Sequence, residues 1–167
     1  EPERLVGVWH TAPGIGIGLL NQSPAFHFTY VEETRTFEHV GMWDRNSVSV
    51  TGLARPEQLQ AMDFTAGVLR ALRVRPILGR GFSDEDEAPE STRTVILSHA
   101  FWQRAFGGDP EVLGRKLVVD GHPRDIIGVL PAGFSLDDTG PALLLPLRFD
   151  RAELFIGNFS YQALARL

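Results

Sequence analysis

The fold is decided by the segment Thr94 to Pro131, TVILSHAFWQRAFGGDPEVLGRKLVVDGHPRDIIGVLP. A short apolar run, Val95 to Leu97, leads into Ser98, a residue type that caps the N-termini of helices. The apolar residues that follow recur with the period of a helix, at Phe101, Trp102, Ala105 and Phe106. The segment therefore predicts a strand followed by an amphipathic helix, and we expect the apolar side of this helix to pack on a sheet.

The second half of the segment predicts a β-hairpin. Glycines end the helix, and Asp109-Pro110 begins a short helical turn, because aspartate caps free N–H groups and proline fits the first helical position. Strands are expected at Lys116 to Val119 and at Arg124 to Leu130. They meet at Asp120-Gly121, a pair that tolerates the positive φ angles of a two-residue turn.

A β-α-β unit is expected ahead of this segment. Arg4 to Trp9 predicts a strand, and His10 to Leu20 predicts a loop whose glycines lack phosphate-binding spacing. Ser23-Pro24 is a typical helix start, and the residues after it supply an apolar helix face made of Phe26, Tyr30, Val31 and Phe37. His39 to Val50 then predicts a strand pair or one bent strand, with a turn at Asp44 to Asn46.

The rest of the chain predicts shorter elements. In chain order they are a strand at Glu57 to Thr65, a helix at Ala66 to Leu72, a helix start at Ser83 before the acidic run Asp84 to Glu87, and a strand at Tyr161 to Leu167. Leu143 to Leu147 predicts one more strand. Pro146 within it favours an edge position, because proline has no N–H to donate.

The composition suits one domain of ordinary size or two small lobes. The 167 residues are 43% hydrophobic, carry a net charge of −5 and include no cysteine. Such a chain lacks the basic surface that binds duplex nucleic acid, so nucleic acid is not expected as a partner. It also lacks disulfides and thiolate sites. Because no apolar run approaches the roughly 18 residues of a membrane helix, and no export leader opens the chain, we expect a soluble fragment.

No motif predicts a catalytic, cofactor-binding or metal-binding residue, and no enzyme activity or cofactor is expected. The five histidines lack zinc-site spacing, and His27 and His99 are expected to be partly exposed. Ser135 lies in a sequence that lacks the second glycine of a nucleophile elbow. The run Asp84 to Glu87 lacks the glycine of a calcium loop, so a solvated, helix-capping role is favoured over loose divalent binding. Most large aromatic residues are expected in the core, among them Trp9, Trp43 and Trp102.

A family resemblance rests on the same segment. The sequences VILSHAFWQRAFGGDPEVLGRKLVVDG and DIIGVLPAGF resemble the extracytoplasmic, or periplasmic, core domain of MacB-like and FtsX-like ABC transporter permeases. The long permeases of acidobacteria are the most similar type. The resemblance extends through RALRVRPILGRGF, Arg70 to Phe82, and the acidic DEDE, and it includes RLVGVW, Arg4 to Trp9. It covers most of the chain.

The resemblance implies an α+β, two-lobed ectodomain. Residues 1–64 would form the first half of a porter-like β-α-β layer, and residues 65–147 a small mixed α/β lobe inserted in it. Residues 148–167 would begin the second half of the porter-like layer, which would be truncated and leave that layer incomplete at the C-terminus. The chain would then be a fragment excised from a permease with transmembrane helices on both sides, and an unpaired edge could lead the isolated fragment to associate.

The function implied is non-catalytic. Such a domain stands on the extracytoplasmic face of the bacterial cytoplasmic membrane and couples cytoplasmic ATP hydrolysis to movement outside it, for export or mechanotransmission. Its partners would be the transmembrane helices of its own permease, a cytoplasmic ATPase subunit or domain, a second permease copy and a periplasmic protein. The alternatives are a ligand-binding module for a peptide, lipid or sugar, favoured by a deep aromatic pocket, and a hydrolase with an unrecognised site.

Overall fold

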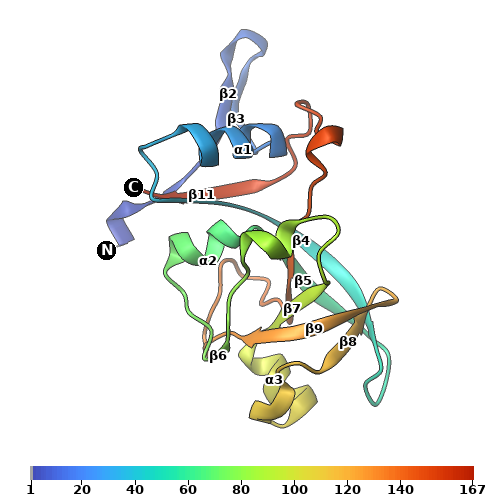
Figure 1. Cartoon of the computed structure of the whole chain (residues 1–167). Coiled ribbons are helices and arrows are strands. Elements are labelled where there is room, and N and C mark those ends of the chain that lie inside the picture. Colours follow the sequence, from blue (N-terminus) through green and yellow to red (C-terminus); the bar gives the residue numbers. More distant parts are fainter. Residues whose placement is uncertain (1) are drawn as a thin grey trace.

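The computed structural model describes residues 2–167 and is built around one nine-stranded mixed sheet (Figure 1). Its elements are β1 (Leu5–Gly7), β2 (His10–Ala12), β3 (Ile17–Leu20), α1 (Pro24–Glu33), β4 (His39–Thr51), β5 (Glu57–Phe64), α2 (Ala66–Leu72), β6 (Leu78–Gly79), β7 (Thr94–Leu97), α3 (His99–Phe106), β8 (Lys116–Val119), β9 (His122–Val129), β10 (Leu143–Pro146) and β11 (Gln162–Arg166). The sheet order is β1-β11-β4-β5-β10-β7-β9-β6, with β8 pairing with β4 and β9, while β2 and β3 form a separate hairpin. This mixed architecture confirms the expected α+β class.

Strand β4 joins the upper and lower parts of the molecule in Figure 1. Its first residues pair antiparallel with β11, and from Trp43 onward it pairs antiparallel with β5. Trp43 is the crossing point, since it lies opposite Gln162 on one side and Phe64 on the other. One strand of 13 residues therefore takes part in both halves of the sheet.

The turn expected at Asp44 to Asn46 is wrong, because these residues lie within β4. The Asp44 carboxylate accepts a hydrogen bond from the Arg45 N–H at 2.8 Å, and the Asn46 side-chain oxygen accepts one from the Ser47 N–H at 2.8 Å. Turn-forming side chains bond to nearby backbone here while the ladder with β5 keeps that backbone extended. The tertiary pairing overrides the local preference.

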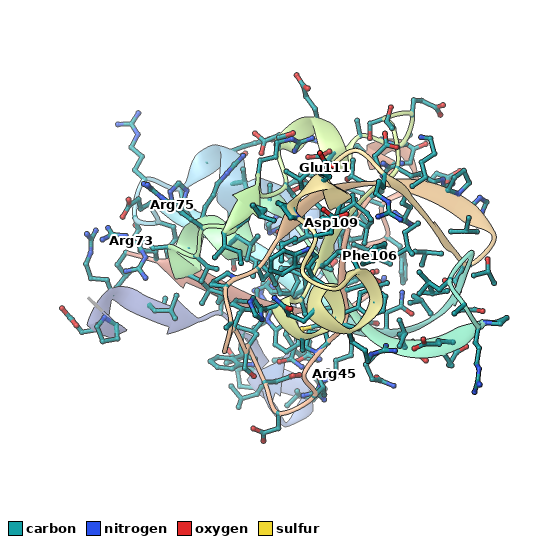
Figure 2. All side chains as sticks on the ribbon, turned by 90° about the horizontal axis from the view of Figure 1, so that it is seen from below. Arg45, Arg73, Arg75, Phe106, Asp109 and Glu111 are labelled. Carbon is teal, nitrogen blue, oxygen red and sulfur yellow. The ribbon has the colours of Figure 1, made fainter. Side chains whose placement is uncertain are left out.

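The strand and helix expected at Val95 and Ser98 are confirmed as β7 and α3. The Ser98 hydroxyl oxygen accepts a hydrogen bond from the Phe101 N–H at 3.1 Å, as an N-cap should. The Trp102 indole N–H donates to the Asp109 carbonyl oxygen at 2.9 Å and holds the turn after α3 against the helix. Figure 2 shows this end of the molecule from below, with Phe106 and Asp109 labelled. Phe101 and Trp102 are buried in the lower core with residues of β7, β8 and β9.

The hairpin at Asp120-Gly121 is also confirmed. The φ angles are 50° at Asp120 and 77° at Gly121, which is the left-handed pair that a tight two-residue turn requires. Asp120 also attaches the turn to β4, because its carboxylate accepts from the Ser49 N–H at 2.8 Å and its N–H donates to the Ser49 carbonyl at 2.8 Å. The β8–β9 hairpin is thus fixed at both its strands and its tip.

The loop expected at His10 to Leu20 is wrong, because β2 and β3 form a hairpin that projects from the molecule (Figure 1). Gly16, with φ at 74°, closes the turn that brings the two strands together. The expected burial of Trp9 is also wrong, since 53% of its side chain is exposed and the ring lies over Gly7 instead of in the core. Trp43 and Trp102 are buried, as expected.

The expected edge position of the Leu143 strand is wrong. β10 lies inside the sheet, parallel to β5 and antiparallel to β7. Pro146 is its last residue, and the Leu147 N–H donates to the Phe64 carbonyl at 2.9 Å just beyond it. A proline at the end of a strand costs the ladder a single donor, so it does not exclude a central position.

The two helices that contact β4, α1 and α2, are confirmed in place, but α1 differs in detail. α1 begins at Pro24 and α2 spans the predicted residues. α1 ends before Phe37, and Val31 is exposed, so the packed face is narrower than expected. Its aromatic side chains instead contact the ring of His10, whose centroid lies 4.6 Å from that of Phe26. This contact anchors the base of the β2–β3 hairpin on α1.

We expect Trp102→Ala to destabilise the protein by roughly 3–5 kcal/mol, because it removes a large buried ring and a hydrogen bond to the turn after α3. Urea denaturation measures the change. The matched control is Trp9→Ala, which removes the same side chain from an exposed position and should change stability little. Equal effects of the two substitutions would contradict the assignment of Trp102 to the core.

Candidate functional site: the cleft between α1 and α2

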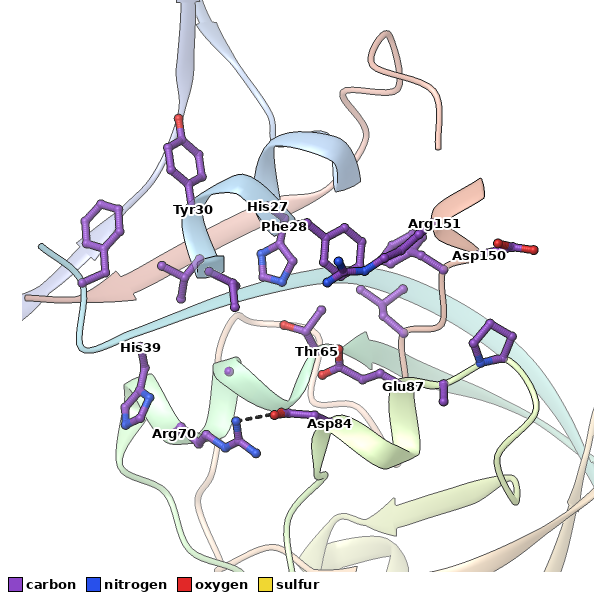
Figure 3. Close-up of a pocket in the computed structure, with 18 of the residues that line it drawn as sticks. His27, Phe28, Tyr30, His39, Thr65, Arg70, Asp84, Glu87, Asp150 and Arg151 are labelled. Atoms are coloured by element: carbon purple, nitrogen blue, oxygen red, sulfur yellow. Dashed lines mark hydrogen bonds and ion pairs between the residues drawn. The ribbon is translucent and has the colours of Figure 1, made fainter. Parts of the chain in front are cut away.

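A cleft of about 510 Å³ opens between α1 and α2, beside the first residues of β4. Its walls come from α1, from the start of β4, from the N-terminal end of α2, from the 3-10 turn η3 (Asp84–Glu87) and from residues 147–151 (Figure 3). Segments far apart in the sequence therefore share one concave surface. Its volume falls within the range of small-molecule sites.

His27 is the polar residue that α1 buries against the cleft. Its ring hangs from α1 toward the cleft in Figure 3, and only 4% of the residue is exposed. The ring nitrogen Nδ1 is buried without a hydrogen-bond partner among residues 2–167. Burial lowers the pKa of His27 to about 4, so the imidazole is neutral at pH 7. The expectation that His27 is partly exposed is wrong.

Glu87 faces the cleft from the opposite wall. Its carboxylate accepts a hydrogen bond from the Ala66 N–H and so caps the first turn of α2. Burial is the main reason that the pKa of Glu87 rises to about 7, and the nearby Asp84 carboxylate raises it further. Asp84 forms an ion pair with Arg70, because a carboxylate oxygen of Asp84 lies 2.8 Å from the Arg70 guanidinium. Glu87 has no ion-pair partner among residues 2–167.

A cation already lies over an aromatic ring at the edge of the cleft. The Arg151 guanidinium carbon is 4.2 Å from the centroid of the Phe28 ring, a cation–π distance, and the guanidinium also pairs with Glu32 at 2.6 Å. Phe149 lies on the same wall, and its ring meets the Phe28 ring edge-on, with 6.3 Å between the two ring centroids. The cleft thus combines carboxylates with aromatic faces.

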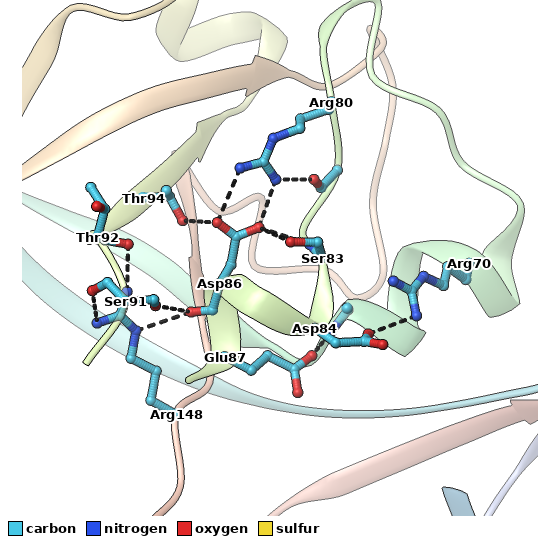
Figure 4. A network of polar contacts seen from close by, with 12 residues as sticks. Arg70, Arg80, Ser83, Asp84, Asp86, Glu87, Ser91, Thr92, Thr94 and Arg148 are labelled. Carbon is cyan, nitrogen blue, oxygen red and sulfur yellow. Dashed lines mark hydrogen bonds and ion pairs between the residues drawn. The ribbon is translucent and has the colours of Figure 1, made fainter. Parts of the chain in front are cut away.

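Asp86 holds η3, and with it Glu87, in place (Figure 4). Its carboxylate accepts hydrogen bonds from Arg80 at 2.6 Å and from Thr94 at 3.2 Å, and it caps the turn through the Ser83 N–H at 2.8 Å. Its carbonyl oxygen accepts from Arg148 Nε at 3.1 Å. Although burial alone would raise the pKa of Asp86, the hydrogen bonds from Arg80 and Ser83 keep it below its usual value. The expected helix-capping role of the acidic run is confirmed, whereas the expected solvation is wrong at Asp86, which is buried.

The structure places His27 and Glu87 in the lining of one cleft, which the sequence did not predict. His27 and Glu87 are separated by 60 positions, and no spacing motif connects them. His99 is partly exposed, as expected, and Ser135 is exposed, with its hydroxyl donating to the Asp137 carbonyl. Among residues 2–167, no group of three or more histidine and carboxylate side chains is arranged to hold a metal ion.

Solved structures with a similar fold include a periplasmic region, an extracellular domain of a transporter and a domain of a permease. The periplasmic region of MacB from Actinobacillus actinomycetemcomitans aligns with a TM-score of 0.68 at 12% identity, over 98% of this chain and 74% of that chain. The extracellular domain of the noncanonic ABC-type transporter YknZ from Gram-positive bacteria gives 0.63 at 15% identity, over 97% and 82%. A domain of a putative permease protein from Porphyromonas gingivalis gives 0.63 at 21% identity, over 98% and 70%.

The fold is therefore that of the periplasmic domain of an ABC transporter permease. The model of the MacB-like periplasmic core domain matches residues 4–166, and the chain belongs to this family. The expected resemblance and the periplasmic location are confirmed. No curated protein matches the chain. Of the helices among residues 2–167, none has the length and apolar character needed to cross a membrane.

Glu87 gives the stability of the domain a testable pH dependence. Its pKa is higher in the folded state than the ordinary 4.5, so between about pH 4.5 and 7 the folded state binds more protons than the unfolded state. The resulting stabilisation is present at low pH and is lost as the pH rises through about 7. Because one pKa unit corresponds to about 1.4 kcal/mol, the wild-type protein should lose at most about 3 kcal/mol relative to Glu87→Gln over this rise.

His27 has the opposite effect and serves as the comparison. Its pKa is lower in the folded state than the ordinary 6.5, so the stability it contributes is lost as the pH falls from about 6.5 to 4. Urea denaturation of the wild-type protein, Glu87→Gln and His27→Phe across about pH 4 to 8 separates the two effects. Identical pH profiles for all three proteins would show that neither group is buried as described.

Proposed function

We propose that this domain is a non-catalytic part of an ABC transporter permease that couples cytoplasmic ATP hydrolysis to movement outside the membrane. The observation that carries the proposal is the continuity of β4. Its first half is bonded to β11, and its second half to β5 and β8. A displacement of the upper half would therefore move the lower half with it, because a hydrogen-bonded sheet resists stretching along its strands.

The two ends of the described chain lie side by side on this sheet (Figure 1). The Leu167 N–H donates to the Arg4 carbonyl at 2.9 Å, and the Val8 N–H donates to the Ala163 carbonyl at 3.0 Å. β1 and β11 are also paired along their length, and β11 continues the ladder to β4. This arrangement supports a path along which movement that enters at β1 or β11 reaches β4.

The proposal assigns different roles to two parts of the domain. Residues 1–64 and 148–167 would form the porter-like layer nearer the source of movement, and residues 65–147 the inserted lobe that is displaced. The partners would be the transmembrane helices of the same permease, a cytoplasmic ATPase subunit or domain, a second permease copy and a periplasmic protein. The projecting β2–β3 hairpin, with Ile15 and Leu19 exposed, is the most prominent surface of the upper half.

Spin labels and fluorophores can test the coupling in the intact permease. Because the chain has no cysteine, Asn21→Cys and Glu111→Cys place labels at exposed positions in the upper and lower halves. The distance between the two labels should stay constant when ATP is added. In a second variant, which carries only Glu111→Cys, a fluorophore is attached at this position. Energy transfer from it to headgroup-labelled lipids should change when ATP is added.

The control is a permease whose ATPase cannot hydrolyse ATP. In this permease, the energy transfer from position 111 to the lipids should not alternate between two values after ATP is added. Unchanged energy transfer in the active permease would contradict the proposed movement. A label-to-label distance that changes with ATP would show instead that the domain deforms internally.

A further inference from the structure

The cleft has a polar side chain on each of two facing walls whose bonding capacity is not fully met by the protein, the buried His27 and the half-buried Glu87. On one wall, Nδ1 of His27 has no partner among residues 2–167. On the other, Glu87 has a single hydrogen bond, to the Ala66 N–H, and no ion-pair partner among the same residues. Both side chains point toward the space between α1 and η3 (Figure 3). The proposed coupling makes no use of either group.

A buried polar atom without a partner, such as His27 Nδ1, is uncommon in folded proteins. A buried polar atom without a partner costs about 1–3 kcal/mol, and such atoms are usually satisfied by a bonded neighbour, an ordered water or a ligand. Here the two groups belong to different elements that enclose a cavity large enough for a small molecule. This combination points to a ligand that bonds to both walls.

The chemistry of the walls determines what kind of ligand fits. A neutral imidazole keeps one nitrogen as a hydrogen-bond acceptor, and an ionised carboxylate only accepts. The lining has four acidic residues and two arginines, a net charge of −2 when all are ionised, so an anionic ligand would be disfavoured even though Asp84 is paired with Arg70. A group with several N–H donors and a positive charge would satisfy both acceptors. The body attached to it would meet the apolar side chains of the lining, Phe149 among them, because the Arg151 guanidinium covers one face of Phe28.

We propose that this cleft binds an organic ammonium ion, a protonated primary amine on a small apolar body, between His27 and Glu87. The ammonium donates hydrogen bonds to both residues and neutralises Glu87. The apolar body packs on the aromatic lining beside Phe28, whose own face is covered by the Arg151 guanidinium at 4.2 Å. The bound ion connects α1 to η3, which Asp86 fixes to β7 through Thr94. The inference does not depend on the proposed coupling.

Calorimetric titration with hexylammonium chloride at about pH 8, where Glu87 is ionised, tests the proposal. We expect saturable binding of one ion per chain, with a Kd of about 1 mM or below. Glu87→Gln keeps an amide oxygen to accept the Ala66 N–H, so the variant should fold and bind at least about tenfold more weakly. His27→Phe keeps a ring in the same place and should also weaken binding. Glu111→Gln, at an exposed position in the 3-10 turn Pro110–Val112 that follows α3, is the matched control and should bind as the wild type does.

Hexan-1-ol and hexanoate separate the contribution of the charge from that of the apolar chain. Neither should bind measurably at the concentrations that saturate the protein with hexylammonium. Equal binding of hexan-1-ol, equal affinity of Glu87→Gln and the wild type, or no saturable binding of hexylammonium would each overturn the proposal.

Discussion

The contact on which the rest of the structure depends is the close approach of α2 to β4. A Cβ atom added at Gly67 would lie 1.7 Å from the Val40 carbonyl oxygen, and one added at Gly41 would lie 2.3 Å from the Val68 nitrogen. Backbone therefore meets backbone, with no side chain between. Thr65 completes the contact, because its N–H donates to the Met42 carbonyl at 2.9 Å and its hydroxyl accepts from the Met42 N–H at 2.8 Å.

The cleft follows from this contact. Because α2 is fixed on β4, its first N–H group, at Ala66, points at a defined position that the Glu87 carboxylate occupies. The network around Asp86 then fixes η3 from the other side, through Arg80, Thr94 and Arg148. At the far end of α2, the buried Arg166 guanidinium donates to the Ala71 carbonyl at 2.6 Å, where a cation is favoured by the helix dipole. Both ends of α2 are thus tied to distant parts of the chain.

Local signals in the sequence were sufficient where neighbouring residues decide the structure. The Ser98 cap, the Asp120-Gly121 turn and the helix at Ala66 act over a few residues, and all three are found as predicted. The length of β4 and the central place of β10 were not predictable in this way, because each depends on strands that are distant in the sequence. In β4, pairing with β5 outweighs the turn preference of Asp44 to Asn46.

The candidate site was not predictable for the same reason. No local motif marks His27 as buried, and most of the elements that enclose the cleft lie more than 30 residues away from it in the sequence. The acidic run was noticed as a cluster, but three of its four carboxylates have different roles that only their partners define. Asp84 pairs with Arg70, Asp86 holds η3, and Glu87 caps α2.

The contact between α2 and β4 is tested most directly by the stability of Gly67→Ala. Alanine is the better helix former by about 1 kcal/mol, so a helix free of close contacts would gain stability from this substitution. The account predicts the opposite, a loss of at least about 2 kcal/mol, because the new methyl group would overlap the Val40 carbonyl oxygen. Gly81→Ala is the control, since its Cβ would lie an ordinary 3.6 Å from the Leu69 side chain. A Gly67→Ala protein as stable as the wild type or the control in chemical denaturation would contradict the account.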